Sequence, residues 1–228
     1  MSITVLEPGP LTTVQDAGRI GYAAQGYRSC GAADRYAYRL ANALLGNPET
    51  AAVLECTLCG AALRFEADTV FALTGADSRA TLDGVPVPFY APLYAKAGSV
   101  LRMGAVQTGL RSYLAVGGGM ATPPVLGSRS TDVKCQIGGL AGRRLQKGDT
   151  LPIGMCDARA LWQRITARQL NRPLKDKLVC VGAHPVREQG AKCLALVRAV
   201  PGPQQDAFSD AARQAFTRSI YTLTPDCD

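Results

Sequence analysis

The sequence lacks the residues and motifs from which many common active sites are built. Histidine occurs once among 228 residues, at His184, and aromatic residues make up 6% of the chain. No His-Glu-x-x-His, Gly-x-Ser-x-Gly or Gly-Lys-Ser/Thr phosphate loop is present. These absences exclude the zinc proteases and serine hydrolases that carry such motifs, and a P-loop on this chain. His184 precedes Pro185 with no obvious nucleophile nearby in sequence, which favours a structural histidine over a catalytic one.

Long apolar runs are also missing. No stretch approaches the roughly 18 consecutive apolar residues of a membrane span. The first residues, MSITVLEPGP, have no basic segment and reach Pro8 before an apolar core can build, so no signal peptide is expected. Eight cysteines without an export signal indicate reduced thiols. The sequence therefore predicts a cytoplasmic protein that does not associate with membranes.

Acidic residues are outnumbered, but the basic excess is not concentrated in sequence. The formal net charge is +7, yet no basic run exceeds the pair Arg143-Arg144. No zinc-finger or RNA-binding signature is present, so nucleic acid is not an expected partner. A dispersed positive charge is more typical of solubility and of encounters with acidic partners.

The cysteine spacing predicts no metal site. Cys56 and Cys59 form a lone Cys-x-x-Cys pair, without the second pair of ligands that a structural zinc ion requires. We interpret them as small buried hydrophobic side chains in preference to metal or redox groups.

The remaining pattern predicts a mainly β fold with a few short helices. Ile3 and Val5 alternate with polar residues, as do Leu63 and Phe65, which is the period of a half-buried strand. Further strand candidates are VFALTG, SVLRMG, SYLAVGG, CLALVRAV and the Asp83-Gly84 hairpin in ATLDGVPV. Turn signals recur about every ten residues, as in β-barrels and sandwiches.

Three segments are predicted to be helical: 33–48, 157–170 and 209–218. In the first, Tyr36, Leu40 and Leu44 recur at i, i+4 with Ala37, Ala41 and Leu45 beside them, and Gly46 begins a stop signal. Asp157 and Ser209 are the expected N-caps of the other two.

We divide the chain into a β-rich part with one helix, residues 1–104, and a second β part, residues 105–228. The chain ends in YTLTPDCD, a strand and turn with nothing after it to close a structure. This ending leads us to expect a C-terminally incomplete second part.

Three acidic residues are candidates for catalysis. Asp16 follows a short strand together with Gln15 and Arg19, and Asp16 and Arg19 have two interpretations: they pair with each other, or they hold a polar ligand. Glu55 follows an apolar run, where a carboxylate is either paired or functional. Asp77 lies in a tight turn after a buried strand. Each could position water or accept a proton.

The segment PVLGSRSTD is the candidate substrate-binding loop. Gly127 would allow the backbone to approach a ligand closely, and Arg129 offers a planar fork suited to a carboxylate or phosphate. Ser128, Ser130 and Thr131 add neutral donors. By itself this composition fits a ligand loop and a polar surface turn equally well.

Several ordered motifs together resemble a known family. They are TTVQDAGRIGY, GAADRYAYRLANALLGN, AAVLECTL, FALTGAD, AGSVLRMG, GLRSYLAVGGGM, PPVLGSRSTD, GRRLQKGDTL and PGPQ, between residues 12 and 204. The sequence resembles the family of the 5-oxoprolinase C subunit, also described as biotin-dependent carboxyltransferase-like or as allophanate hydrolase subunit 2. It is similar as well to half of the carboxyltransferase domain of urea carboxylase.

This resemblance implies a cyclophilin-like β-barrel and work within a complex. The A and B subunits of 5-oxoprolinase would join this chain as partners in opening 5-oxo-L-proline to L-glutamate with ATP, a cofactor shared with those subunits. This chain alone would be inactive. The family usually continues beyond residue 228, in agreement with the expected incompleteness, and the resemblance favours the ligand loop over the surface turn.

Two alternative functions remain open. The first is a biotin-dependent carboxyltransferase half of the urea or allophanate type. Because the chain has no Met-Lys-Met motif, its biotin would be attached to another chain. The second is a regulatory partner of a kinase inhibitor that does no chemistry.

Overall fold

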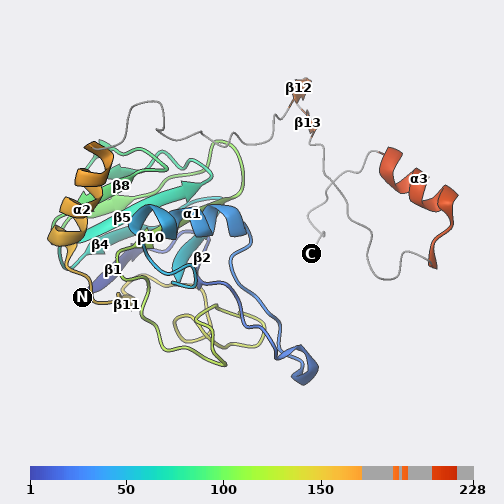
Figure 1. Ribbon diagram of the computed structural model, residues 1–228, viewed down its shortest axis with the longest axis horizontal. Helices are drawn as coiled ribbons and strands as arrows, with labels where there is room; N and C mark the ends of the chain where they lie inside the picture. The colour runs from blue at the N-terminus through green and yellow to red at the C-terminus, as the bar shows by residue number, and fades with distance from the viewer. Residues whose placement is uncertain (171–186, 190–191, 195–206, 220–228) are drawn as a thin grey trace. The chain divides into compact units, whose positions relative to one another are not determined.

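The computed structural model describes residues 1–170, 187–189, 192–194 and 207–219 (Figure 1). The chain divides into two compact units, Met1–Arg172 and Pro173–Asp228. In the second unit the described elements are strands β12 (Arg187–Gln189) and β13 (Lys192–Leu194), which pair antiparallel, and helix α3 (Asp210–Arg218). The side chain of Ser209 accepts a hydrogen bond from the Ala212 amide, so the predicted N-cap of this helix is confirmed.

The first unit contains two antiparallel sheets. One has the strand order β11-β1-β4-β9-β6-β7. Its strands are β1 (Ser2–Glu7), β4 (Ala62–Phe65), β6 (Thr81–Leu82), β7 (Val85–Pro86), β9 (Val100–Arg102) and β11 (Thr150–Pro152). The other has the order β2-β3-β10-β5-β8. Its strands are β2 (Leu11–Gln15), β3 (Val53–Thr57), β5 (Thr69–Gly75), β8 (Pro92–Ala95) and β10 (Arg111–Val116).

The five-stranded sheet is buried on both faces, which explains the continuous apolar run in β5. Phe71 and Leu73 point into a core shared with the six-stranded sheet. Val70 and Ala72 point the other way, into a second core under helices α1 (Arg35–Leu45) and α2 (Ala158–Leu170). The unit therefore has three layers: sheet, sheet and helices.

Helix α1 packs on the sheet with one side of its predicted apolar stripe. Ala37, Tyr38, Ala41 and Leu45 are buried, whereas Tyr36 of the predicted apolar stripe is exposed. Alanines on the buried face let the helix approach the sheet closely, so the face is chosen by packing and not by side-chain size alone. The predicted stop at Gly46 is confirmed, because Gly46 caps the helix in the left-handed conformation.

Isolated bridges join the two sheets at their corners. Met120 bridges Ala52, next to β3, and Ile153, next to β11, while Cys59 bridges Ala105 beyond β9. The mainly β, barrel-like fold with short helices is thus confirmed. The strands predicted around residues 3, 63, 70, 100 and 112 are all present, and Asp83 and Gly84 form the expected hairpin turn with positive φ angles.

Two other expectations concern the organisation of the chain. Strand β10 lies between β3 and β5 in one sheet, so the pairing crosses the predicted boundary between residues 104 and 105. Of the predicted strand CLALVRAV, the structure describes residues 193 and 194 in β13. The predicted strand and turn YTLTPDCD lie outside the described residues.

The N-cap of α1 provides a direct test of local stability. The Asp34 side chain accepts hydrogen bonds from the amides of Tyr36 and Ala37 at 3.1 and 3.0 Å. We expect Asp34→Ala to lower the free energy of unfolding by about 1 kcal/mol, because it leaves these amides without their acceptor. Urea denaturation measures the change. Asp34→Asn retains the acceptor and should stay close to wild type; equal losses in both variants would contradict the capping role.

Candidate functional site

The Asp16 carboxylate is the centre of the candidate site. Its Oδ1 accepts hydrogen bonds from the Ser128 hydroxyl at 2.7 Å, the Ser130 hydroxyl at 2.5 Å and the Gly18 amide at 2.8 Å. Its Oδ2 accepts one from the Arg129 amide at 2.6 Å. The Asp16 amide donates in turn to the Ser130 hydroxyl. One buried carboxylate therefore fixes the start of the 128–131 loop against the end of β2.

The loop is held by a tight turn just before these contacts. Val125 and Ser128 exchange backbone hydrogen bonds, and Leu126 and Gly127 between them have φ angles of 50° and 74°. Positive φ at both central residues is the geometry of a two-residue hairpin turn, which accounts for glycine at position 127. A Cβ at Gly127 would meet no atom within 4 Å, so the conformation and not the available space is what requires glycine.

The hydroxyl groups of the loop donate their hydrogen bonds within the chain. Ser128 and Ser130 donate to Asp16, and Thr131 donates to the Val14 carbonyl. All three residues are buried. Their predicted role in binding a ligand stays a prediction, and in this arrangement they determine where the loop lies.

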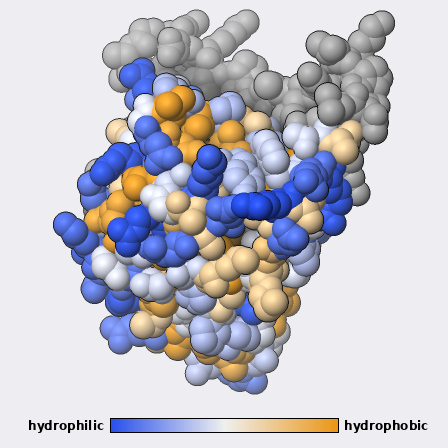
Figure 2. All heavy atoms as spheres, turned by 90° about the vertical axis from the view of Figure 1, so that its left-hand side faces the viewer, coloured by the Kyte–Doolittle hydropathy of each residue, from blue (hydrophilic) through white to orange (hydrophobic). Residues whose placement is uncertain are grey.

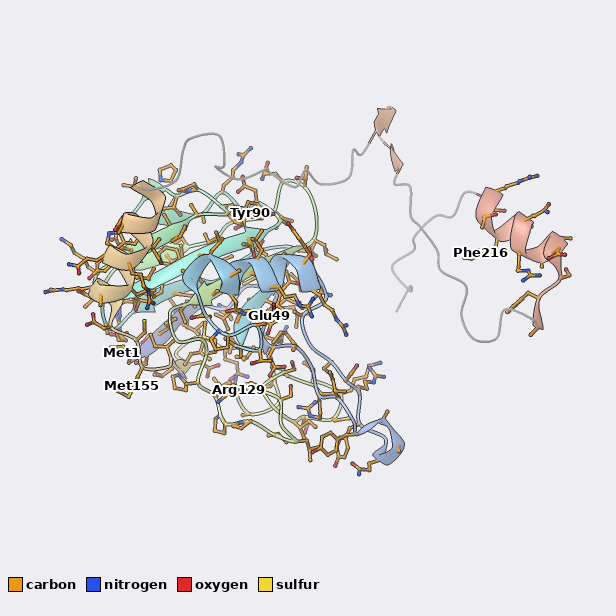
Figure 3. The ribbon with its side chains drawn as sticks, in the orientation of Figure 1. Met1, Glu49, Tyr90, Arg129, Met155 and Phe216 are labelled. Carbon is orange, nitrogen blue, oxygen red and sulfur yellow. The ribbon has the colours of Figure 1, made fainter. Side chains whose placement is uncertain are left out.

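Arg129 differs from its neighbours because most of its donors are available. Its Nε donates to the Thr122 carbonyl at 2.7 Å, and its backbone amide to Asp16. Within the described residues its Nη1 and Nη2 atoms have no hydrogen-bond or ion-pair partner. Figure 3 shows Arg129 among the loops that follow β10, well separated from Met1 and Met155. A half-buried guanidinium with two available nitrogens is suited to bind a carboxylate or phosphate.

Arg19 is buried and does not pair with Asp16. With 1% of its surface exposed, it donates from Nε to the Val125 carbonyl and from Nη2 to the Ser130 carbonyl, at 3.1 and 3.0 Å. Its Nη1 is buried without a partner among the described residues. The expected alternative of an Asp16–Arg19 ion pair is therefore wrong, since each side chain is engaged by other groups.

Gln15 adds a second buried side chain with an available atom. Its amide nitrogen donates to the Thr131 carbonyl at 3.2 Å and to the Thr13 hydroxyl at 3.0 Å, while its Oε1 has no partner in the described part of the chain. Gln15 and Arg19 thus bind consecutive carbonyls of the same loop. The structure brings the predicted residues around positions 15–19 and 127–131 together.

Glu55 belongs to a neighbouring network. Its carboxylate accepts hydrogen bonds from the Ala33 amide and the Tyr113 hydroxyl, both at 2.8 Å, and pairs with Arg111 at 2.7 Å. The network is linked to the first through the backbone, because the Ala32 amide donates to the Asp16 carbonyl. Burial and the Glu55 charge raise the pKa of Tyr113, so its hydroxyl remains protonated and continues to donate.

Asp77 lies apart from both networks. It is exposed in the turn after β5, where its side chain accepts a hydrogen bond from the Arg79 amide at 2.8 Å. The catalytic roles assigned to Asp16, Glu55 and Asp77 stay predictions.

Two residues of the Glu55 network, and one buried residue beside the 128–131 loop, were missed from the sequence. Arg111 and Tyr113 lie two residues apart on β10, so their side chains are on the same face of the sheet. Tyr113 is paired directly with Glu55 on β3, which brings both side chains close to its carboxylate. Asp132 is buried next to the loop, with an Oδ2 that has no partner within the described ranges. The run SYLAVGG predicted the strand, but only the pairing register could have revealed the contact.

A hollow elsewhere on the unit does not include any predicted site residue. It is open and has a volume of about 590 Å³. Its lining includes Met1 at the N-terminus, Asp68 just before β5, and Met155 and Arg159 around the start of α2. Figure 2 views this side of the molecule and shows apolar side chains scattered among hydrophilic ones. Its charged groups already have partners, since Asp68 binds Tyr94 and Arg159.

Comparison with known proteins identifies the family. The family model that matches residues 25–228 describes the carboxyltransferase domain, subdomains A and B. The chain belongs to this carboxyltransferase-domain family. Two curated relatives are the C subunit of 5-oxoprolinase from Escherichia coli, 41% identical over 97% of this chain, and that from Haemophilus influenzae, 33% identical over 99%. The chain covers 64% and 66% of those proteins, so it spans slightly less than two thirds of their length.

A solved structure shares the fold as well as the sequence. The crystal structure of Kluyveromyces lactis urea amidolyase superimposes with a TM-score of 0.67 at 39% identity, over 69% of this chain and 10% of that one. The expected resemblance to the 5-oxoprolinase C subunit and to urea carboxylase is thereby confirmed. In the part of the chain that the structure describes, no helix has both the length and the apolar character needed to cross a bilayer.

The Asp16 contacts lead to a stability prediction. Asp16→Asn would place an amide NH2 group against one of the donors now bound by the carboxylate. We expect a loss of about 2–4 kcal/mol in the free energy of unfolding, because buried donors would lack an acceptor. Chemical denaturation measures the loss. Asp77→Asn is the matched control and should change stability by less than about 0.5 kcal/mol, since Asp77 is exposed.

The buried Cys56 thiol leads to a prediction about pH. Burial raises its pKa from 9.0 to about 11. The unfolded thiol loses its proton near pH 9 while the folded one keeps it, so its contribution to stability is complete below pH 9 and is lost between pH 9 and 11. Between pH 9 and 11 we expect the free energy of unfolding of wild type to fall by about 2 kcal/mol more than that of Cys56→Ala. Denaturation curves at both pH values measure this, and equal losses in Cys56→Ala and wild type would contradict it.

Proposed function

We propose that the chain is a subunit of an ATP-dependent 5-oxoprolinase that opens 5-oxo-L-proline to L-glutamate together with its partner subunits. The observation that carries this proposal is the 41% identity to the 5-oxoprolinase C subunit across 97% of the chain. The proposal includes the A and B subunits as partners, no activity of this chain alone, and a cytoplasmic location.

The chemistry requires more than this chain contains. A lactam is a resonance-stabilised amide, and ATP supplies the energy that makes its carbonyl carbon electrophilic. The chain has no Gly-rich loop with Gly-Lys-Ser/Thr to bind the phosphates of ATP, so we assign ATP binding chiefly to the partner subunits. What this chain supplies is a means to hold the substrate.

We assign the substrate carboxylate to Arg129. Its Nη1 and Nη2 atoms form the planar fork that a carboxylate binds through two parallel hydrogen bonds. Asp16 is a positioning residue for Arg129. It accepts hydrogen bonds from the Arg129 amide and from the hydroxyls of both neighbouring serines, so it fixes the backbone from which the Arg129 side chain extends. Gln15 and Arg19 fix the next two residues of the loop through their carbonyls.

A carboxyltransferase half of the urea type is the second candidate. The fold and sequence shared with urea amidolyase favour it. Urea and 5-oxoproline both contain an amide group, but urea has no carboxylate. An Arg129 contact with the amide substrate itself therefore favours 5-oxoproline, whereas a contact with the transferred carboxyl group would fit the second candidate.

The decisive assay follows 5-oxoproline-dependent release of glutamate and ADP from the assembled subunits, and from mixtures in which each subunit is left out. Activity that requires this chain supports the proposal. If the subunits assemble without releasing glutamate from 5-oxoproline, but transfer a carboxyl group from carboxybiotin to urea, the second candidate would replace the proposed function.

The Arg129 side chain can be tested within the same assay. We expect Arg129→Ala to raise the KM for 5-oxoproline at least about tenfold, the loss of one charge-assisted contact, with a smaller effect on kcat. Arg129→Lys should recover part of the loss, because it keeps the charge without the fork. The loop itself is held by the Arg129 amide and should remain in place.

Arg164→Ala is the matched control, since Arg164 is exposed on α2. Unchanged kinetics of the Arg129→Ala enzyme would remove the carboxylate contact from the proposal, while leaving the need for this chain intact.

A further inference from the structure

A projecting segment of the chain, residues 18–31, forms what we call the arm. Its base is narrow: a Cβ at Gly31 would lie 3.0 Å from the Cα and amide nitrogen of Gly18, and the Arg19 amide donates to the Ser29 carbonyl at 2.5 Å. Beyond the base the chain makes one short 3₁₀ turn, η1 (Ala23–Gln25), and returns. Figure 1 shows the arm extending from the sheets beside the loops that follow β10.

The arm is anchored in a way that a simple surface loop is not. The buried Arg19 side chain ties its base to the Val125 and Ser130 carbonyls. At the same time residues 23–29 are exposed throughout. A segment with a fixed base and an exposed tip presents its side chains with less entropy left to lose on binding.

Apolar side chains are exposed on the arm and on the loop next to it. Ile20 is 79% exposed and Tyr27 37% exposed on the arm, and Val133 is 50% exposed on the loop. The two segments are neighbours, because the Arg19 side chain at the base of the arm donates to the carbonyls of Val125 and Ser130, and Ser130 lies three residues before Val133.

The charges around these apolar residues have one sign. Segments 17–33 and 117–148 contain one acidic residue, Asp132, and it is buried. The same segments contain seven basic residues: Arg19, Arg28, Arg129, Lys134, Arg143, Arg144 and Lys147. Of these, Arg28 and Lys134 are exposed next to the apolar residues, whereas Arg19 is buried and Arg143 pairs with Asp149, so the exposed charges beside Ile20, Tyr27 and Val133 are basic.

We propose that Ile20, Tyr27 and Val133, with Arg28 and Lys134 at their rim, form a docking surface for a protein whose own face has an apolar centre and an acidic rim. Apolar and aromatic residues at the centre and charged residues at the rim are the usual composition of such interfaces. The choice of occupant rests on the proposed function, which makes another subunit of the complex the partner.

The charges also argue against two other occupants. A second copy of this chain would bring a basic rim against a basic rim, which like-charge repulsion opposes. A nucleic acid would engage Arg28 and Lys134 but would leave the aliphatic side chains of Ile20 and Val133 without a function.

The test uses the full chain and the purified B and A subunits, with binding measured by calorimetry. We expect Val133→Ser and Lys134→Glu each to weaken binding at least about tenfold, and added salt to weaken wild-type binding but not that of Lys134→Glu to the same degree. The matched controls are Val85→Ser and Lys96→Glu. They make the same chemical changes at exposed positions outside the arm and its neighbouring loop, and should bind like wild type.

A second readout uses native thiols. Cys135 is exposed within the proposed surface, and Cys156 lies beside α2. Binding of the partner should slow alkylation of Cys135 and leave that of Cys156 unchanged, as followed by mass spectrometry of the labelled peptides.

The outcomes separate this proposal from the proposed function. Weaker binding in the two surface variants alone supports the docking surface, even if the complex releases no glutamate from 5-oxoproline. Equal binding by all four variants overturns the docking surface, even if the complex is active. Failure of wild type to bind either partner, or self-association of the wild-type chain through Val133, also overturns it.

Discussion

The candidate site depends on the capture of one loop by one buried carboxylate. Among the described residues Asp16 has no cation as a partner; three side-chain or backbone donors approach one oxygen and one amide the other. A buried charge is tolerated when donors replace its hydration, and each such hydrogen bond is stronger than one between neutral groups. The arrangement explains why two serines flank Arg129: their hydroxyls satisfy Asp16, which leaves the guanidinium free of that task.

The position of this site follows from how the five-stranded sheet is covered. Its inner face is sealed by the other sheet, and its outer face by α1 and α2. Thr13, Gln15, Glu55 and Tyr113 alternate with inward-facing apolar residues and so lie on the outer face. Polar groups there are shielded from solvent, and the chain satisfies them with the segment that leads into α1 and with the 128–131 loop. The site thus lies where the helical layer gives way to loops.

Much of the fold could be predicted because its signals are local. Alternation at Ile3 and Val5, the Asp83-Gly84 turn and the Gly46 stop each act over a few residues, and all three are present. The predicted apolar stripe of α1 is wider than the face that packs, because Ala37, Ala41 and Leu45 are buried and Tyr36 is exposed. Both edges of the stripe are apolar enough to pack. Which one is buried depends on the surface of the sheet beneath, and that surface is built from residues distant in sequence.

The candidate site was predictable in its members but not in its connections. Asp16, Ser128 and Ser130 were singled out from composition, yet the sequence could not show that the hydroxyls donate to the carboxylate across more than 100 residues. Similarly, Glu55 was recognised without Tyr113, because their contact depends on the register of β3 and β10. Local chemistry identifies polar groups that need partners, whereas tertiary pairing determines which partners they receive.

Arg19 connects the 128–131 loop to the arm that is proposed to bind a partner. Its backbone amide closes the base of the arm, while its side chain holds the carbonyl next to Arg129. The base of the arm is thus joined to the loop through the Arg19 side chain, and also through the Gly18 amide, which donates to Asp16. If the arm is where a partner binds, the same contact that assembles the complex also fixes the residue proposed to hold the substrate. The loop is already held within this chain by the Asp16 hydrogen bonds, so Arg19 links the arm to a loop whose position is set before any partner binds.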